Sequence, residues 1–164
     1  MRHAYFAGGC FWCITPCFTR LPGVGEVVSG FSGGDEENPA YEDVKHQKTG
    51  HRETVSVAYD PGQVSFDRLL AVFLANVDPF DGGGQFIDRG RSYTLAVYYQ
   101  NEEERAAAQS RLNALVEKAG KAPQVALEPF KGFWPAGEEH QYFYLRNPEA
   151  FEKEMEASGR RKKE

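Results

Sequence analysis

The apolar positions of this chain follow two periods. In several short stretches, β-branched and aromatic residues alternate with polar ones or run together, which indicates strands. The predicted strands cover residues 2–7, 24–31, 53–59, 93–99 and 124–130. Between some of them, apolar residues recur every three or four positions, which is typical of helices with one buried face.

The clearest predicted helix begins after Ser65, a residue that caps helix N-termini well. Its apolar residues fall at i, i+3, i+4, i+7 and i+8 and form one face: Phe66, Leu69, Leu70, Phe73 and Leu74. A long helix is predicted from Asn101 to about residue 119, with Glu104 in the capping-box position. Two further helical regions cover about 10–21 and 136–158, the second broken around Asn147-Pro148.

Polar or Gly-rich segments over 34–50 and 79–91 are predicted as loops, and loops of this length are often functional. The chain shows neither repeats nor a linker. We therefore predict an α+β fold: a single-domain two-layer sandwich, with helices packed on a mixed or antiparallel sheet with a ferredoxin-like core. The catalytic domain is expected to span residues 1–158, and the charged tail 159–164 to be a frayed end.

Composition and charge narrow the classes of partner. Apolar residues make up 41% of the 164 residues, which is enough for a core, and the formal net charge is −5. A net negative charge argues against nucleic acid or an anionic membrane as the main partner. No apolar run could span a bilayer, and the start lacks the features of a signal peptide, so we expect a cytoplasmic protein. We also expect it to be a monomer.

The cysteines cluster at one point: Cys10, Cys13 and Cys17 lie within eight residues. An odd, clustered set is not a disulfide framework, and in a reducing compartment it indicates a catalytic or metal-binding role. The strand ends at Gly8-Gly9, and a helix is predicted to begin at or just after Cys10. The positive field of a helix N-terminus favours the thiolate, so Cys10 is predicted to be an activated nucleophile.

Each of the other two thiols has alternative roles. Cys13 lies about one turn after Cys10 and could close a C-x-x-C disulfide, whereas Cys17 is favoured slightly as a core residue. Together with His51, the three thiols could also form a Cys₃His zinc site. Thiols on successive turns of one helix converge poorly on a tetrahedral ion, which argues against zinc.

Several other residues are candidates for the chemistry around the thiol. Phe11 and Trp12 offer an apolar wall, and Glu53 lies where the polar loop becomes a strand. Partial burial raises the pKa of a carboxyl group, which could then donate a proton near neutral pH. From the residues alone, however, a surface glutamate at a strand end is the favoured interpretation of Glu53. Further polar candidates lie in or beside the loops and are weak signals individually: Tyr41, Tyr93 and Asp88.

Short motifs over about residues 3–149 occur in an order typical of one enzyme family. They are Gly8-Gly9-Cys10-Phe11-Trp12, Leu21-Pro22-Gly23-Val24, Ser29-Gly30-Phe31-Ser32-Gly33-Gly34, Asn38-Pro39-Ala40-Tyr41, Thr49-Gly50-His51-Arg52-Glu53, Asp60-Pro61, Asp78-Pro79, Gln85-Phe86-Ile87-Asp88-Arg89-Gly90, Tyr93 and Phe133-Trp134-Pro135-Ala136-Gly137-Glu138-Glu139-His140-Gln141. With these segments the chain resembles the A-type peptide-methionine sulfoxide reductases, which reduce the S epimer of methionine sulfoxide.

The resemblance implies a role for each candidate residue. Cys10 is the nucleophile, and Phe11 and Trp12 hold the S-methyl group of the substrate. The polar residues act on the oxygen and on substrate position: Glu53 as proton donor, Tyr41 and Tyr93 as hydrogen-bond donors, and Asp88 as a positioning group. A sulfoxide sulfur is electrophilic only if its oxygen can take a proton, so these residue types fit the reaction.

The implied cycle leaves Cys10 as a sulfenic acid, which a second thiol condenses into a disulfide. An external dithiol, usually thioredoxin in this family, then reduces that disulfide, and no metal or organic cofactor is needed. The substrate is methionine S-sulfoxide, either free or in proteins.

The sequence departs from the common family pattern at two places. Cys13 stands where many members have Gly, and Thr15 where many have Glu. In addition, no cysteine follows Cys17, whereas many members carry resolving cysteines in a C-terminal tail. The resolving thiol is therefore Cys13 or Cys17, unless the reductant attacks the sulfenic acid directly. We favour Cys13 because a C-x-x-C loop closes with the least rearrangement.

Two other functions remain as alternatives. A thioredoxin-like C-x-x-C disulfide oxidoreductase also places this motif between a strand and a helix, but the bulky Phe11-Trp12 pair is unusual for a disulfide exchanger. A peptide-binding module with an aromatic pocket accounts for that pair and leaves the thiols unexplained.

Overall fold

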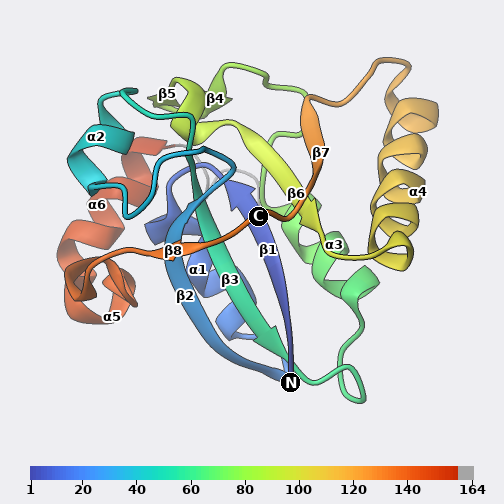
Figure 1. The fold of residues 1–164 in the computed structure, drawn as a ribbon, viewed down its shortest axis with the longest axis horizontal. Helices are drawn as coiled ribbons and strands as arrows, with labels where there is room; N and C mark the ends of the chain where they lie inside the picture. The colour runs from blue at the N-terminus through green and yellow to red at the C-terminus, as the bar shows by residue number, and fades with distance from the viewer. Residues whose placement is uncertain (159–164) are drawn as a thin grey trace.

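A computed structural model describes residues 1–158, so the predicted tail 159–164 lies outside the described residues. A mixed sheet forms the centre of the molecule (Figure 1). Its strands, in the order β7-β6-β1-β3-β2-β8, are Val125–Pro129, Leu95–Tyr99, Arg2–Gly8, Arg52–Tyr59, Val24–Ser32 and Trp134–Pro135. All neighbours in this sheet are antiparallel except β6 and β7, which are parallel.

The helices of the described residues flank this sheet. They are α1 (Phe11–Thr19), α2 (Tyr41–Lys45), α3 (Phe66–Ala75), α4 (Glu102–Ala119), α5 (Phe143–Arg146) and α6 (Pro148–Ser158), with 3₁₀ turns η1 (Arg91–Tyr93) and η2 (Glu138–His140). Figure 1 shows α2, α5 and α6 on one flank of the sheet and α3 and α4 on the other. A small hairpin of β4 (Gly84–Gln85) and β5 (Asp88–Arg89) lies at one end.

The order β1-α1-β2-β3-α3-β6 along the chain, with β6-β1-β3-β2 adjacent in the sheet, is a ferredoxin-like core. The predicted α+β sandwich is therefore confirmed. The predicted caps also form: Ser65 Oγ accepts the Arg68 N–H at 3.0 Å, and Asn101 Oδ1 accepts the Glu104 N–H at 2.9 Å. Residues 136–158 contain the two predicted helical pieces, α5 and α6, which meet at Asn147, preceded by η2.

The main core lies between the sheet and the helices α1, α3 and α4. Phe6 of β1 is fully buried there and stacks on Phe18 of α1 and Phe73 of α3, with ring centroids 5.3 and 5.1 Å apart. Tyr5, the preceding residue, points to the opposite face and stacks on Phe130 at 4.0 Å. Alternation along one strand thus gives both faces of the sheet an aromatic cover.

Three predicted segments differ from the structure. The predicted strand 93–99 begins only at Leu95, because Tyr93 belongs to η1. The predicted loop 34–50 contains α2, and the predicted loop 79–91 contains the β4–β5 hairpin. Both elements are too short for an apolar period to show, and the hairpin depends on Gln85, whose side chain accepts the Asp78 N–H at 2.8 Å and donates to the Asp78 carbonyl at 2.9 Å.

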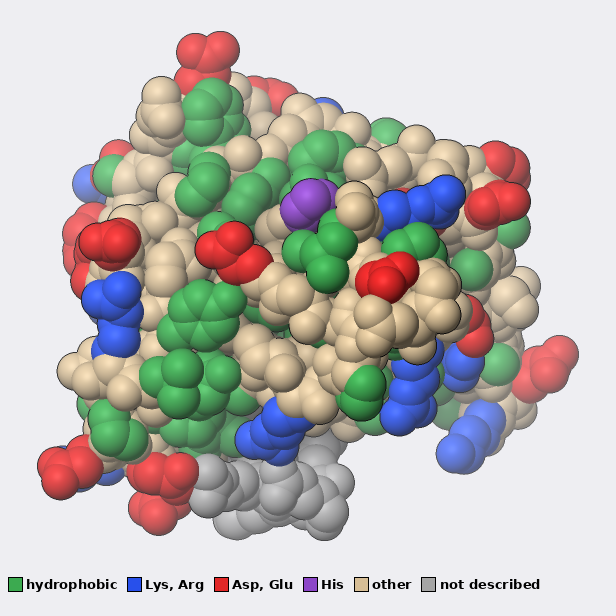
Figure 2. Space-filling model, turned by 90° about the horizontal axis from the view of Figure 1, so that it is seen from below, with side chains coloured by type: hydrophobic (Ala, Val, Ile, Leu, Met, Phe, Trp, Pro, Cys, Tyr) green, Lys and Arg blue, Asp and Glu red, His purple; other side chains and the backbone are tan. Residues whose placement is uncertain are grey.

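The surface carries charges of both signs. On the face in Figure 2, acidic and basic side chains are interspersed among apolar ones. None of the helices in residues 1–158 is both long and apolar enough to cross a membrane.

Candidate active site

The turn between β1 and α1 places Cys10 at a helix N-terminus. Gly9 has φ +87°, a left-handed conformation that favours glycine, and a side chain at Gly8 would lie 3.1 Å from both Ile14 and Phe73. The two glycines therefore permit a sharp reversal packed tightly against α3. Cys10 becomes the N-cap of α1 and is 6% exposed.

Glu53 of β3 reaches this helix from 42 residues away. Its Oε1 accepts the N–H of Phe11, the first residue of α1, at 3.1 Å. Its Oε2 is buried and forms no hydrogen bond with the residues that the structure describes. Burial raises the pKa of Glu53 to about 8, with a smaller contribution from the charge of Asp88. The carboxyl group is thus predominantly protonated at neutral pH and can act as an acid.

Cys10 differs from the predicted activated thiolate. A hydrogen bond with Cys13, burial and the charges of Cys13, Glu53 and Asp88 raise the pKa of the Cys10 thiol well above its ordinary value. Glu53 also accepts the first N–H of α1, that of Phe11. These surroundings disfavour the thiolate that the helix N-terminus was predicted to favour, and burial likewise favours the protonated form of Glu53.

An aromatic cluster covers the start of α1. Trp12 stacks on Phe143 with ring centroids 4.1 Å apart, and Tyr41 lies 4.1 Å from the ring of His140. The Trp12 indole N–H donates to Nδ1 of His140 at 3.2 Å, and the Phe11 ring lies 5.6 Å from the same imidazole. Phe11 and Trp12 thus belong to an aromatic cluster next to Cys10, in which Phe11 is fully buried.

His140 is a residue that the sequence reasoning missed as part of the site. It is 7% exposed, and burial lowers its pKa, which keeps Nδ1 available as an acceptor for Trp12. The available signal was its place in the motif segment 133–141, but its contact with Trp12 spans 128 residues and has no local pattern.

The two predicted tyrosines lie in the same site as the acid and the thiol. Burial first, and then the charges of Glu53, Cys10 and Asp88, raise the pKa values of Tyr41 and Tyr93, so both remain neutral donors. Tyr41 belongs to α2, in a segment predicted as a loop, and Tyr93 belongs to η1, in a segment predicted as a strand. The structure therefore brings together five predicted site residues from separate parts of the chain: Cys10, Tyr41, Glu53, Asp88 and Tyr93.

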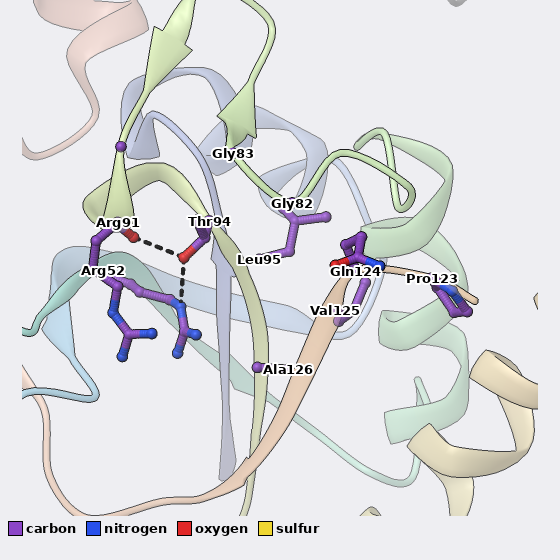
Figure 3. A pocket seen from close by; sticks show the side chains of 11 residues that line it. Arg52, Gly82, Gly83, Arg91, Thr94, Leu95, Pro123, Gln124, Val125 and Ala126 are labelled. Carbon is purple, nitrogen blue, oxygen red and sulfur yellow. Dashed lines mark hydrogen bonds between the residues drawn. The ribbon is translucent and has the colours of Figure 1, made fainter. Parts of the chain in front are cut away.

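A hydrogen-bond chain on the opposite side of β3 holds Tyr93 in place. Arg52 and Glu53 are consecutive, so their side chains point to opposite faces of the sheet. Arg52 Nε donates to Thr94 Oγ1 at 2.8 Å, and Thr94 Oγ1 donates to the Arg91 carbonyl at 2.7 Å (Figure 3). This chain ties β3 to η1. Arg52 and Thr94 also line the cavity drawn in Figure 3. This cavity has a volume of about 610 Å³, and none of the predicted site residues lines it.

Cys13 lies beside Cys10, whereas Cys17 and His51 lie in other surroundings. Sγ of Cys10, Sγ of Cys13 and a carboxylate oxygen of Glu154 all lie within 4.8 Å of one another. Cys17 lies one turn beyond, packed against the core. Nε2 of His51 is 2.7 Å from the Glu36 carbonyl and Nδ1 accepts the Gly34 N–H at 3.2 Å, so the Cys₃His set is not assembled.

A buried thiol pair, a buried carboxyl group and two half-buried tyrosines in one site are typical of a thiol oxidoreductase. The comparison with protein families agrees with this class and specifies it. The family model for peptide methionine sulfoxide reductase matches residues 2–164, and the chain belongs to that family. The sequence-based recognition is thereby confirmed, as is the predicted class of enzyme, and a C-x-x-C disulfide oxidoreductase is not the family indicated.

Individual relatives support the assignment. The chain is 47% identical to the peptide methionine sulfoxide reductase MsrA of Halalkalibacterium halodurans over 98% of this chain and 92% of that protein. It is 30% identical to the methionine sulfoxide reductase A of Corynebacterium diphtheriae, with a TM-score of 0.79 over 89% of this chain and 74% of that one.

Mxr1 from Saccharomyces cerevisiae shares the fold. Its reduced form is 22% identical, with a TM-score of 0.84 over 90% of this chain and 86% of that one. The same protein has been solved in complex with Trx2, with a TM-score of 0.58 at 17% identity over 87% of this chain and 84% of that one.

Proposed function

We propose that this protein reduces the S epimer of methionine sulfoxide, free or in proteins, with Cys10 as the nucleophile and Glu53 as the acid. The observation that carries the residue roles is the buried position of the Glu53 carboxyl group. It is 1% exposed, is held by the first N–H of the helix that begins beside Cys10, and has a buried second oxygen without a protein partner among the described residues. A buried neutral acid next to a thiol is what a sulfoxide requires, because its oxygen must be protonated as its sulfur is attacked.

In the reductive step, the S-methyl group packs against Phe11 and Trp12, and the sulfoxide oxygen accepts hydrogen bonds from Glu53, Tyr41 and Tyr93. The Cys10 sulfur attacks the sulfoxide sulfur as the thiol loses its proton and Glu53 protonates the oxygen. The thiol proton passes to water. The new sulfur–sulfur bond then breaks as the hydroxyl group moves from the substrate sulfur to the Cys10 sulfur, so methionine leaves, Cys10 becomes a sulfenic acid, and Glu53 is left as a carboxylate. Asp88 adds negative charge at this site and is proposed to position the substrate.

Cys13 then resolves the sulfenic acid, since its sulfur lies within 4.8 Å of the Cys10 sulfur. Cys17 is one turn farther along α1, so we assign it at most a later relay. A thioredoxin-type dithiol reduces the Cys10–Cys13 disulfide by exchange. The Mxr1 complex with Trx2 is support for such a partner, because Mxr1 has the same fold. The cycle is proposed to need no metal or organic cofactor.

The test is reduction of a blocked methionine sulfoxide with dithiothreitol as reductant. We expect turnover of the S form, none of the R form, and loss of activity in Cys10→Ser. Retained activity in Cys10→Ser contradicts the assigned nucleophile. Reduction of insulin disulfides without any reduction of sulfoxide would instead favour a disulfide oxidoreductase.

We also propose that the protein acts as a monomer in the cytoplasm, with residues 1–158 as one catalytic domain. The clustered, free cysteines are suited to a reducing compartment. Size-exclusion chromatography with light scattering tests the monomer, and a particle of twice the 18.4 kDa chain mass contradicts it.

A further inference from the structure

A second carboxylate faces the thiol pair from the C-terminal helix. Glu154 lies on α6, and one of its carboxylate oxygens is within 4.8 Å of the sulfurs of both Cys10 and Cys13. The reductive step described above uses Glu53 and leaves Glu154 without a role. The nucleophile and the resolving thiol belong to α1, so this carboxylate is contributed by a segment more than 130 residues away in the chain.

The position of Glu154 on its helix is unusual for a charged residue. Phe151, Glu154 and Ser158 share one face of α6, and this face is the packed one: Phe151 is 7% exposed and Ser158 is 4% exposed. The neighbouring Glu152, Lys153 and Glu156 are exposed, as expected for charged side chains. Glu154 alone among these acidic residues is turned toward the thiols.

The segment that carries Glu154 is anchored to the sheet. Gln141 Oε1 accepts the Ser29 N–H at 2.8 Å, and its Nε2 donates to the Ser29 carbonyl at 2.9 Å. The Thr19 and Tyr144 hydroxyls lie 2.9 Å apart, which joins α5 to the end of α1. These contacts hold α5 and α6 against α1, so Glu154 is held near Cys13 and not placed there by a free tail.

We propose that Glu154 is the proton acceptor for the disulfide-forming step. Its carboxylate takes the Cys13 thiol proton as the Cys13 sulfur attacks the sulfur of the Cys10 sulfenic acid. The sulfur–sulfur bond forms, the sulfur–oxygen bond breaks, and Glu154 passes the proton to the departing hydroxide, which leaves as water. The Cys13 sulfur is oxidised, the Cys10 sulfur is reduced, and the carboxylate is regenerated.

The chemistry requires such a group. Only the thiolate attacks a sulfenic acid efficiently, and Cys13 is 1% exposed, so its proton has little access to solvent. The Glu154 carboxylate and the Cys13 sulfur lie within 4.8 Å of each other, and catalytic hydrogen bonds that are long in the free enzyme often tighten during the reaction. Glu53 is the competing acceptor, because it has given up its proton in the preceding step.

The inference rests on the proposed roles of Cys10 and Cys13, and a single turnover without reductant separates the two steps. Methionine release measures the reductive step. Trapping of the sulfenic acid with dimedone, followed by mass spectrometry, measures how quickly the disulfide replaces it. The variants are Glu154→Gln, which keeps shape and removes the base, Glu154→Asp, which keeps the base, and the exposed Glu156→Gln on the same helix as the matched control.

For Glu154→Gln we expect methionine release within about twofold of wild type, which also shows that the variant folds, and disulfide formation slower by roughly tenfold or more. Its disulfide rate should rise with pH, because Cys13 must then ionise unaided, and Glu154→Asp should recover part of the wild-type rate. Glu156→Gln should match wild type in both steps.

Disulfide formation in Glu154→Gln at the wild-type rate and with the wild-type pH profile overturns the role of Glu154 and leaves Glu53 as acceptor. An equal loss of methionine release and disulfide formation in Glu154→Gln and Glu154→Asp also overturns it, since a structural role then accounts for the effect. Failure of wild type to release methionine refutes the proposed function instead.

Discussion

Replacing Glu53 with Gln removes the acid from the reductive step while keeping its shape. The amide oxygen of Gln can still accept the Phe11 N–H, which Glu53 Oε1 now accepts at 3.1 Å, so the start of α1 keeps its anchor. The amide cannot protonate the sulfoxide oxygen. A positioned general acid contributes about a hundredfold or more, so we expect a loss of roughly 10² in rate, or about 2.7 kcal/mol of transition-state stabilisation.

The pKa of Glu53 gives this prediction a pH signature. Because the pKa is raised to about 8, the wild-type reductive rate should fall as the pH rises through about 8, where the acid is lost. Stability should follow the same group: a raised folded-state pKa favours folding below the unfolded value near 4.5, and this advantage is lost as the pH rises to about 8. The Gln side chain does not titrate, so Glu53→Gln keeps its stability over this pH range. The free energy of unfolding of Glu53→Gln relative to wild type should therefore increase between pH 4.5 and 8, by at most about 5 kcal/mol.

The assay is single-turnover release of methionine from a blocked S-sulfoxide between pH 6 and 9.5, paired with urea unfolding at each pH. The exposed Glu103→Gln serves as control and should leave both profiles unchanged. A Glu53→Gln rate within threefold of wild type at pH 7, or a variant that keeps the decline near pH 8, would refute the assignment of Glu53 as the acid.

Four further substitutions test the site and its scaffold. Cys13→Ser should release one equivalent of methionine at the wild-type rate and accumulate sulfenic acid. Cys17→Ser should still form the Cys10–Cys13 disulfide. Peptide mapping that finds a Cys10–Cys17 bond as the first disulfide in wild type would contradict the assignment of Cys13 as the resolving thiol. Tyr41→Phe should slow the reductive step by about tenfold by removing one hydrogen bond to the sulfoxide oxygen, and an unchanged single-turnover rate excludes that contact. Gly9→Ala should lower the free energy of unfolding by about 1–2 kcal/mol, because Gly9 has φ +87°, and an unchanged urea midpoint shows that this turn carries no strain.

Most of the fold was predictable because its signals are local. The caps at Ser65 and Asn101, the apolar face of α3 and the β-branched strand β3 each depend on residues within a few positions. The segments that were missed, α2 and the β4–β5 hairpin, are held by side chains from elsewhere or from across a loop. Gln47, for example, uses its amide to bind Ser92 of η1, donating at 2.8 Å and accepting at 3.0 Å.

By itself, the sequence determined the strand, the Gly8-Gly9 turn, a thiol at the start of a helix and a second thiol one turn later, since all of these depend on neighbours in the chain. The protonation of that thiol was decided only by the tertiary structure. Glu53 comes from 42 residues away to accept the first N–H of α1, while a hydrogen bond with Cys13, burial and nearby charges raise the pKa of Cys10. The burial of Cys10, the hydrogen bond between Glu53 and α1, and the position of Glu154 near the thiols all result from long-range packing. A pKa depends on these surroundings more than on neighbouring residues in the sequence.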